Sequence, residues 1–342
     1  MKRKTKILLI YTGGTIGMIR DFKSGVLQTF DFKDLLTHIP ELNHLECSIR
    51  ATSFKHPIDS SNMNPTYWVE LATIIEKRYD SFDGFVVLHG SDTMSYTSSA
   101  LSFMLENLSK PVIFTGSQLP IGDLRTDAKE NLITSIQIAA LRENGKPVVA
   151  EVGLYFEYKL YRANRTTKLT AEHFEAFSSL NYPPLAKSGV HLSIHKEALL
   201  KPNFRKKLKV HRAMESNILL LKLFPGISPS TLDYLLSFPQ LKGLVLETYG
   251  SGNVTSEAWF LDSLAKVKKR GIPIINVTQC SGGSVQMGLY ETSIGLKKLG
   301  VISGKDITTE AALAKLMYLL GQEVSPSSIK TLFETPLRGE MG

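Results

Sequence analysis

Short apolar runs that end in glycine turns, separated by stretches of helical periodicity, constrain the fold of this chain more than any other feature of its sequence. Residues 6–11 and 85–88 are apolar runs of strand length, and apolar residues recur at helical spacing over 65–79, 94–108 and 128–142. Alternating strands and helices build parallel sheets that are covered by helices. The first half of the chain is therefore predicted to form an α/β domain with a mainly parallel sheet.

A second α/β series follows a basic segment of weak periodicity. Apolar runs recur at 218–224, 243–247 and 272–277, and a last helix is predicted from about 306 to 320. Single hydrophobic cores rarely grow beyond about 250 to 300 residues, so a chain of 342 residues is expected to form two domains. The predicted boundaries are an N-terminal domain at 1–190, a connecting segment at 191–215 and a C-terminal domain at 216–342.

The composition excludes several classes of protein. The net charge of +8 is spread along the chain apart from residues 201–212, which are interpreted as a solvated connection, so no nucleic-acid partner is expected. No apolar segment approaches the roughly 20 residues of a membrane helix. Two cysteines, Cys47 and Cys280, provide no disulfide framework, and the eight histidines show no ligand spacing. A chain of the reducing cytoplasm is expected, with no metal and no membrane partner.

Two turns that follow predicted strands carry hydroxyl and carboxylate groups. Thr12-Gly13-Gly14-Thr15 follows the first apolar run, and His89-Gly90-Ser91-Asp92-Thr93 follows the second. Glycines adopt positive φ and let a backbone approach a ligand closely, and open parallel sheets bind ligands at the carboxyl ends of their strands. The first motif alone could be a nucleotide-binding turn, although the full dinucleotide fingerprint and the P-loop lysine are missing. Together, the two turns indicate amide chemistry.

Several polar residues have a structural explanation beside the functional one. Asp92 could cap the following helix, and His89 is expected to be packed or hydrogen-bonded rather than a general base. Lys168 could belong to an exposed basic turn. A lysine buried beside Ser91 would instead be driven toward the neutral amine, which could accept a proton from the hydroxyl. The turn Asp59-Ser60-Ser61-Asn62-Met63 is ordinary by itself but could hold the carboxylate of a small zwitterion.

The order of these motifs resembles that of bacterial-type L-asparaginases, and most closely their cytoplasmic type I branch. The motifs that carry the resemblance are Thr12 to Gly17, Ser60 to Met63, His89 to Thr93, Thr115-Gly116-Ser117-Gln118, Arg165 to Lys168, Tyr249 to Asn253 and Thr278-Gln279-Cys280. The resemblance covers nearly the whole chain. It implies a larger, flavodoxin-like N-terminal domain with the active site, a smaller C-terminal α/β domain, no cofactor, and assembly as a homodimer or homotetramer.

The resemblance also implies the reaction and the roles of the site residues. The reaction is hydrolysis of L-asparagine to L-aspartate and ammonia, with L-glutamine as a candidate second substrate. Thr15 would attack the amide carbon, and Ser91, Asp92 and Lys168 would form a relay. Backbone N–H groups of the two turns would stabilise the oxyanion. The substrate-binding set is Asp59, Ser60, Gly90, Ser91, Asp92 and Ser117.

Two positions near the reacting atoms depart from the family pattern. The second hydroxyl belongs to Ser91 where threonine is usual, so its χ1 is less restrained. The loop after Thr15 offers no tyrosine at residues 24–26. Tyr290, in the second half, is the candidate for activating Thr15, and simple packing of its ring is an equal alternative.

A third departure concerns regulation. Type I enzymes carry an arginine of an asparagine effector site where this chain has Glu247. Thr167 and Cys280 match other positions of that site. An acid would not pair with an effector carboxylate as arginine does, so allosteric control is not expected to persist unchanged.

Two other functions fit the same scaffold. The amidase subunit of a tRNA-dependent amidotransferase would use the same centre to supply ammonia, but that relative carries an extra N-terminal domain, and here the first strand begins by Lys6. A non-catalytic amino-acid sensor would not require the complete set of Thr15, Ser91, Asp92 and Lys168.

Overall fold

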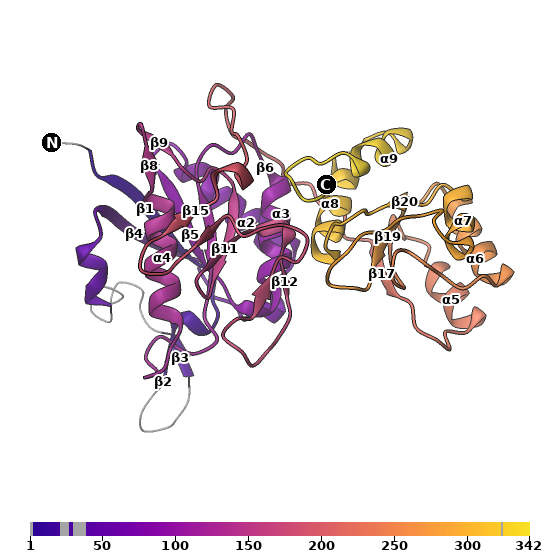
Figure 1. Ribbon diagram of the computed structural model, residues 1–342, viewed down its shortest axis with the longest axis horizontal. Coiled ribbons are helices and arrows are strands. Elements are labelled where there is room, and N and C mark those ends of the chain that lie inside the picture. Colours follow the sequence, from indigo (N-terminus) through magenta and orange to yellow (C-terminus); the bar gives the residue numbers. More distant parts are fainter. Residues whose placement is uncertain (1–2, 21–26, 30–38, 323) are drawn as a thin grey trace. The chain divides into compact units, whose positions relative to one another are not determined.

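The computed structural model describes residues 3–20, 27–29, 39–322 and 324–342. The chain forms two compact units, Met1–Val210 and His211–Gly342 (Figure 1). Residues 24–26, which contain no tyrosine, lie outside the described residues. Part of the predicted connection at 191–215 pairs within the first unit, because β15 (Ser193–Ile194) extends its sheet and β16 (Lys209–Val210) pairs with β6 (Leu105–Glu106).

The first unit contains an eight-stranded sheet with the order β15-β14-β11-β10-β7-β5-β1-β4. Its five parallel strands are β1 (Thr5–Tyr11), β4 (Cys47–Ser53), β5 (Gly84–Leu88), β7 (Val112–Thr115) and β10 (Val152–Phe156). Numbered along the chain, these five stand in the order 2-1-3-4-5, which is the flavodoxin-like arrangement. The mainly parallel α/β sheet predicted from the sequence is confirmed.

Short antiparallel strands complete this unit. The sheet is extended by β11 (Lys159–Arg162) and β14 (Ala186–Lys187). Three small hairpins pair β2 (Met18–Arg20) with β3 (Leu27–Thr29), β8 (Arg142–Glu143) with β9 (Lys146–Pro147), and β12 (Thr167–Lys168) with β13 (Phe177–Ser178).

The described α-helices of the first unit are α2 (Pro65–Arg78), α3 (Met94–Met104) and α4 (Ala128–Ala140), and α3 and α4 pack on the parallel strands. Asn64 caps α2 by accepting a 2.9 Å hydrogen bond from the N–H of Thr66, as its position before a proline predicts. Helix α3 ends four residues before the predicted limit of 108. Leu105 pairs with Val210 instead, and Asn107 adopts a φ of 61° that no α-helix contains.

Alternation along β1 decides which side chains enter the core. Ile7 and Leu9 share a buried cluster with Leu132 and Ile136 of α4. Successive side chains of a strand point to opposite faces, so the even-numbered residues of β1 face away from α4. This second face becomes important at the edge of the sheet.

The second unit has a four-stranded parallel sheet in chain order, formed by β17 (Ile218–Lys222), β18 (Gly243–Thr248), β19 (Ile274–Thr278) and β20 (Ile302–Ser303). Its helices are α5 (Pro229–Leu236), α6 (Ala258–Lys269), α7 (Glu291–Lys298), α8 (Thr309–Gly321) and α9 (Pro326–Glu334). The three longer strands and helix α8 occur where the sequence predicts them, whereas α9 follows the helix that was predicted to be the last.

A buried ion pair fixes the end of the chain to this unit. The side chains of Lys315 on α8 and Glu340 are both fully buried and in contact. The ammonium group also donates to the carbonyls of Phe333 (2.6 Å) and Thr335 (2.8 Å). Burial lowers the pKa of Lys315, and Glu340 opposes that shift. Because each charge lacks access to water, loss of either partner would leave the other charge buried and uncompensated.

Candidate active site

The two glycine turns lie at the point where the strand order of the first sheet reverses. β1 is flanked by β4 on one side and β5 on the other, and the chain crosses β1 between forming these two strands. Thr12, directly after β1, donates from its N–H (3.0 Å) and its Oγ1 (3.1 Å) to the carbonyl of Leu88, the last residue of β5. Ligands of this kind of sheet bind in the crevice at the switch point. The structure therefore brings the two motifs together, as their positions at strand ends predict.

Close backbone packing holds the first turn in place. Gly13 and Gly14 have φ angles of 132° and 90°. A Cβ on Gly14 would lie 2.5 Å from the Cα of Gly90, and one on Gly13 would lie 1.9 Å from the carbonyl oxygen of Ile58. Only glycine fits either position. Thr15 follows as the first residue of a 3₁₀ turn (Thr15–Gly17) and is half-buried.

The Tyr11 ring packs against this turn. Its hydroxyl donates to the carbonyl of Gly14 at 3.2 Å, and the ring leaves no space for a Cβ on Gly17. Burial raises the pKa of Tyr11 to about 12. Tyr11 therefore remains a neutral hydrogen-bond donor that fixes the backbone on both sides of Thr15.

The turn with Asp59 and Ser60 closes one side of the site. Ser60 is buried, and its Oγ would lie 2.5 Å from a Cβ placed on Gly90. Thr93 Oγ1 donates to the Ser60 carbonyl at 2.7 Å. Asp59 is exposed and accepts from the N–H and the Oγ of Ser61, which lowers its pKa. The structure thus joins a segment between β4 and α2 to both glycine turns.

Ser91, Asp92 and Lys168 form one hydrogen-bonded group. Lys168 Nζ donates to Ser91 Oγ at 2.8 Å and to Asp92 Oδ1 at 2.7 Å. The Lys168 side chain is 17% exposed and that of Asp92 is 65% exposed. Lys168 therefore does not lie in a free basic turn, and the group reaches from a sheltered hydroxyl to a carboxylate in contact with water. Asp92 makes no capping hydrogen bond to the following helix.

Gln118 is a site residue that the sequence-based prediction missed. Its Oε1 accepts from Ser91 Oγ at 3.2 Å, and its Nε2 donates to the carbonyls of Ala171 and His173. Ser91 Oγ therefore has two partners, which hold its rotamer although the methyl of a threonine is missing. The contact joins residues 27 positions apart, so no local pattern could have predicted it.

The loop that carries Gln118 depends on a buried carboxylate. Asp127 accepts from the N–H groups of Gln118 (3.0 and 3.1 Å) and Leu119 (3.2 Å), and from Asn131 Nδ2 at 3.1 Å. Burial raises the pKa of Asp127, and these hydrogen bonds oppose that shift. Ser117 is also buried, and its hydroxyl donates to the Leu119 carbonyl at 2.6 Å. The Ser117 hydroxyl is therefore used in a hydrogen bond within the loop. Only the backbone near Ser117 is available to contact a substrate.

His89 is buried and bonded at both ring nitrogens, as the sequence predicts. Nδ1 lies 2.7 Å from the Gly90 carbonyl, which can only accept, so Nδ1 carries the proton. Nε2 then accepts from Thr97 Oγ1 (2.9 Å), which in turn accepts from Trp68 Nε1 (3.1 Å). Burial lowers the pKa of His89 to about 4. The neutral ring fixes the Gly90 peptide and performs no acid–base task near neutral pH.

The remaining predicted residues belong to different parts of the chain. Thr167 lies on β12 of the first unit. Glu247 and Cys280 lie at the ends of the neighbouring strands β18 and β19 in the second unit. Glu247 accepts from Thr309 Oγ1 at 2.6 Å and lies 3.7 Å from Lys222 Nζ. Tyr290 precedes α7 and is 53% exposed.

Metal ligands and membrane-spanning helices are both missing from the described residues. Across residues 3–20, 27–29, 39–322 and 324–342, no group of three His, Cys, Asp or Glu side chains could hold a metal ion. Within the same ranges, no helix has the length and apolar character needed to cross a membrane.

Known families and proteins resemble this chain over nearly its full length. The family model for the N-terminal domain of asparaginase matches residues 6–200, and the model for the C-terminal domain of glutaminase/asparaginase matches residues 217–333. Over 340 residues the chain is 42% identical to L-asparaginase 1 of Escherichia coli, in a match that covers 99% of this chain and 98% of that protein.

Two more relatives bear on the fold and on the alternative functions. The crystal structure of L-asparaginase I from Vibrio cholerae matches with a TM-score of 0.90 and 40% identity, covering 99% of this chain and 100% of that one. A glutamyl-tRNA(Gln) amidotransferase protein of Methanobrevibacter smithii is 34% identical over 353 residues, covering 98% of this chain and 77% of that protein.

His89 is predicted to remain neutral well below the usual range of histidine. An unfolded chain binds a proton at this ring near pH 6.5, whereas the folded chain binds it only near pH 4. The free energy of unfolding therefore decreases as the pH falls from about 6.5 toward 4. Above about pH 6.5 the protonation of this ring does not affect it. Nitrogen-15 NMR should show the Nδ1–H tautomer at about pH 5, with the signal assigned by its loss in His89→Gln. A titration midpoint above about pH 6 would contradict the buried, hydrogen-bonded ring.

Proposed function

The chain belongs to the asparaginase family, and from this premise we propose that it hydrolyses L-asparagine to L-aspartate and ammonia. The observation that carries the proposal is the hydrogen-bonded group of Ser91, Lys168 and Asp92 beside the glycine turn that presents Thr15. The identity of 42% with L-asparaginase 1 of Escherichia coli supports the same reaction. The reaction uses side chains, backbone N–H groups and water, and no cofactor.

Thr15 is the proposed nucleophile. Its Oγ1 attacks the carboxamide carbon, the C–N bond breaks, and ammonia leaves with a proton from the site. Water then cleaves the resulting ester and releases aspartate. The absence of side chains at Gly14 and Gly90 leaves the two turns close together, and their N–H groups would stabilise the oxyanion by about 3 kcal/mol per donor.

Ser91, Lys168 and Asp92 are the proposed proton relay. Lys168 donates to both oxygens, so a proton can pass between Ser91 and the exposed carboxylate of Asp92. Gln118 accepts from Ser91 and leaves the hydroxyl in one orientation. This arrangement supports serine as a working substitute for the threonine that is usual in the family.

The substrate-binding set surrounds the same turns. Asp92 would hold the α-ammonium group of asparagine, and the buried Ser60 would hold its α-carboxylate. Asp59, whose pKa is lowered by the Ser61 N–H, adds a second negative charge for the ammonium. Gly90 and the backbone at Ser117 would border the carboxamide. L-Glutamine is the proposed second substrate, because one more methylene changes binding by only about 1 to 3 kcal/mol.

Tyr290 is the proposed acceptor of the Thr15 proton. The residue is 53% exposed in the second unit, and its hydroxyl could accept a proton. This exposure supports a hydroxyl that is available to a reacting group. Simple packing of the ring is the alternative interpretation.

Control by asparagine at a second site is proposed to be weak or absent. The Glu247 carboxylate accepts a hydrogen bond from Thr309 Oγ1 and lies 3.7 Å from Lys222 Nζ. Thr167 and Cys280 would complete such a site. A carboxylate effector would be repelled by Glu247 rather than bound.

Assembly and location follow the relatives in this proposal. A homodimer or homotetramer in the cytoplasm is proposed, because the order of the motifs resembles that of the cytoplasmic type I branch. The amidase subunit of an amidotransferase is a lesser alternative, because the identity to that relative is 34% and the match covers 77% of it. A sensor without turnover would not need the aligned group of Ser91, Lys168 and Asp92.

Replacing Thr15 tests the proposed reaction. Thr15→Ala removes the attacking oxygen at a half-buried position outside the buried core cluster, so we expect kcat to fall at least about 10⁴-fold with the fold intact. Steady-state ammonia release measures kcat, and circular dichroism checks the fold. Thr15→Ser, which keeps the oxygen, is the matched control and should keep measurable turnover. Near-normal turnover in Thr15→Ala would overturn the assignment.

The same assay separates the two interpretations of Tyr290. Tyr290→Phe keeps the ring and removes the hydroxyl. A fall in kcat of at least about tenfold supports proton acceptance, and an unchanged kcat excludes Tyr290 from the mechanism.

The charge of Glu247 predicts the shape of the saturation curve. Ammonia release should depend hyperbolically on asparagine, because no effector carboxylate is bound beside Glu247. Initial rates over a wide range of asparagine concentration provide the measurement, and a parallel series with glutamine gives the substrate preference. A clearly sigmoidal curve for asparagine would show that effector control persists.

A further inference from the structure

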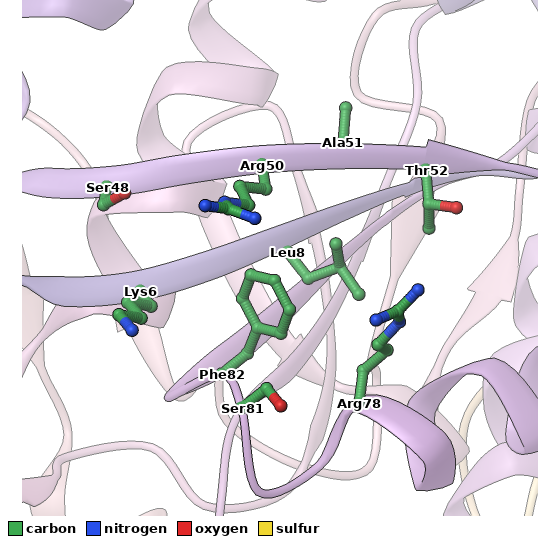
Figure 2. A pocket seen from close by; sticks show the side chains of 9 residues that line it. All are labelled: Lys6, Leu8, Ser48, Arg50, Ala51, Thr52, Arg78, Ser81 and Phe82. Atoms are coloured by element: carbon green, nitrogen blue, oxygen red, sulfur yellow. The ribbon is translucent and has the colours of Figure 1, made fainter.

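A hollow of about 380 Å³ opens on the first unit, at the β4 edge of its large sheet (Figure 2). Its walls come from β1, β4, the end of α2 and the turn at residues 81–82. A volume of this size suits a small ligand. The residues that form it play no part in the site around Thr15.

Strand register explains why these side chains gather. β1 and β4 are parallel, with Lys6 opposite Ser48 and Leu8 opposite Arg50. Because side chains alternate along a strand, these four residues of β1 and β4 lie on the face of the sheet that points away from α4. β4 is the last strand of the sheet, and α2 ends at Arg78, which closes the far side of the hollow.

The charges of the hollow are of one sign. Lys6, Arg50 and Arg78 line it, and no carboxylate does. In the part of the chain that the structure describes, no ion pair involves these three side chains. The nearby Asp83 accepts from the backbone N–H of Lys6 (2.8 Å) and pairs with Arg3 (2.6 Å), so its charge is already compensated. The three cations therefore face the hollow without a counter-charge.

The floor of the hollow is apolar and its rim carries hydroxyl groups. Leu8 and Phe82 form the floor and are 3% and 8% exposed. Figure 2 shows the ends of Lys6, Arg50 and Arg78 around these two side chains. Ser48, Thr52 and Ser81 add hydroxyl donors at the rim. Such a set of cations and neutral donors above a small apolar surface offers hydrogen bonds to an anion from several directions.

We propose that this hollow binds a small phosphate-bearing anion. Two guanidinium forks match the oxygens of phosphate, and an ammonium adds a point charge. Three cations call for a ligand with about two or three negative charges, which a phosphate ester or a diphosphate carries and a single carboxylate does not. The apolar floor suits the organic part of such an ester. β1 and α2 both run from this hollow to the turns that carry Thr15 and Ser60, so the two sites are separate.

Isothermal titration calorimetry on the full chain tests the proposal. The probes are inorganic pyrophosphate, which offers phosphate alone, and ADP, which adds an organic part. We expect Kd values below about 1 mM. Thr15→Ala should bind the probes as the unchanged protein does, so the result is independent of whether the chain hydrolyses asparagine.

Matched variants separate the hollow from general charge. R50Q/R78Q should weaken binding of both probes at least about tenfold. K55Q/K77Q removes two exposed positive charges that lie close in sequence to Thr52 and Arg78 but outside the lining, and should leave Kd within about twofold. R50K/R78K, which keeps the charge, checks that any loss does not come from misfolding and should bind more tightly than R50Q/R78Q. Absence of binding by both probes at about 10 mM, or equal weakening in R50Q/R78Q and K55Q/K77Q, would overturn the proposal.

Discussion

The candidate active site depends on the contact between two backbones that carry no side chains. Gly14 and Gly90 approach so closely that a Cβ on Gly14 would lie 2.5 Å from the Cα of Gly90. The contact is possible because β1 and β5 are neighbours and both end at the switch point of the sheet. This approach holds the turn of Thr15 beside the turn of Ser91.

Two buried networks hold the contact rigid. Tyr11 fixes the carbonyl of Gly14 from one side, and His89 fixes the carbonyl of Gly90 from the other. Both are buried groups whose neutral form is favoured near neutral pH. Asp127 likewise holds the loop of Gln118, because its carboxylate accepts a hydrogen bond from the Gln118 N–H. The groups proposed to react are thus supported by residues that would not themselves touch a substrate, and a catalytic site requires such precise placement.

The sequence predicted those elements whose bounds are set by residues close to them in the chain. The apolar run of β1, the cap at Asn64 and the glycine turn before Thr15 each carry their own pattern, and each occurs as predicted. β4 was not predicted, because an edge strand with Ser48, Arg50 and Thr52 on one face lacks an apolar run. The early end of α3 could not be predicted either, since its cause is pairing with Val210, about a hundred residues later.

The same distinction separates the predicted from the missed residues of the site. Ser91, Asp92 and Lys168 were predicted because they stand in ordered motifs, and the structure places Ser91 Oγ and Asp92 Oδ1 within 2.8 Å of Lys168 Nζ. Gln118 stands in one of the same motifs but received no role, because its partners Ser91 and Ala171 come from other loops. Asp127 resembles a helix cap in sequence, yet its carboxylate turns back to the Gln118 loop. Contacts between loops decide such roles, and single-sequence patterns do not encode them.

A crystal structure of the Thr15→Ala variant with L-asparagine tests the central claim most directly, because the missing oxygen should preserve the substrate. The account predicts the carboxamide carbon beside residue 15, the α-ammonium group on Asp92 and the α-carboxylate on Ser60. Asparagine bound elsewhere, or with its carboxamide turned away from the Gly14 and Gly90 turns, would contradict it.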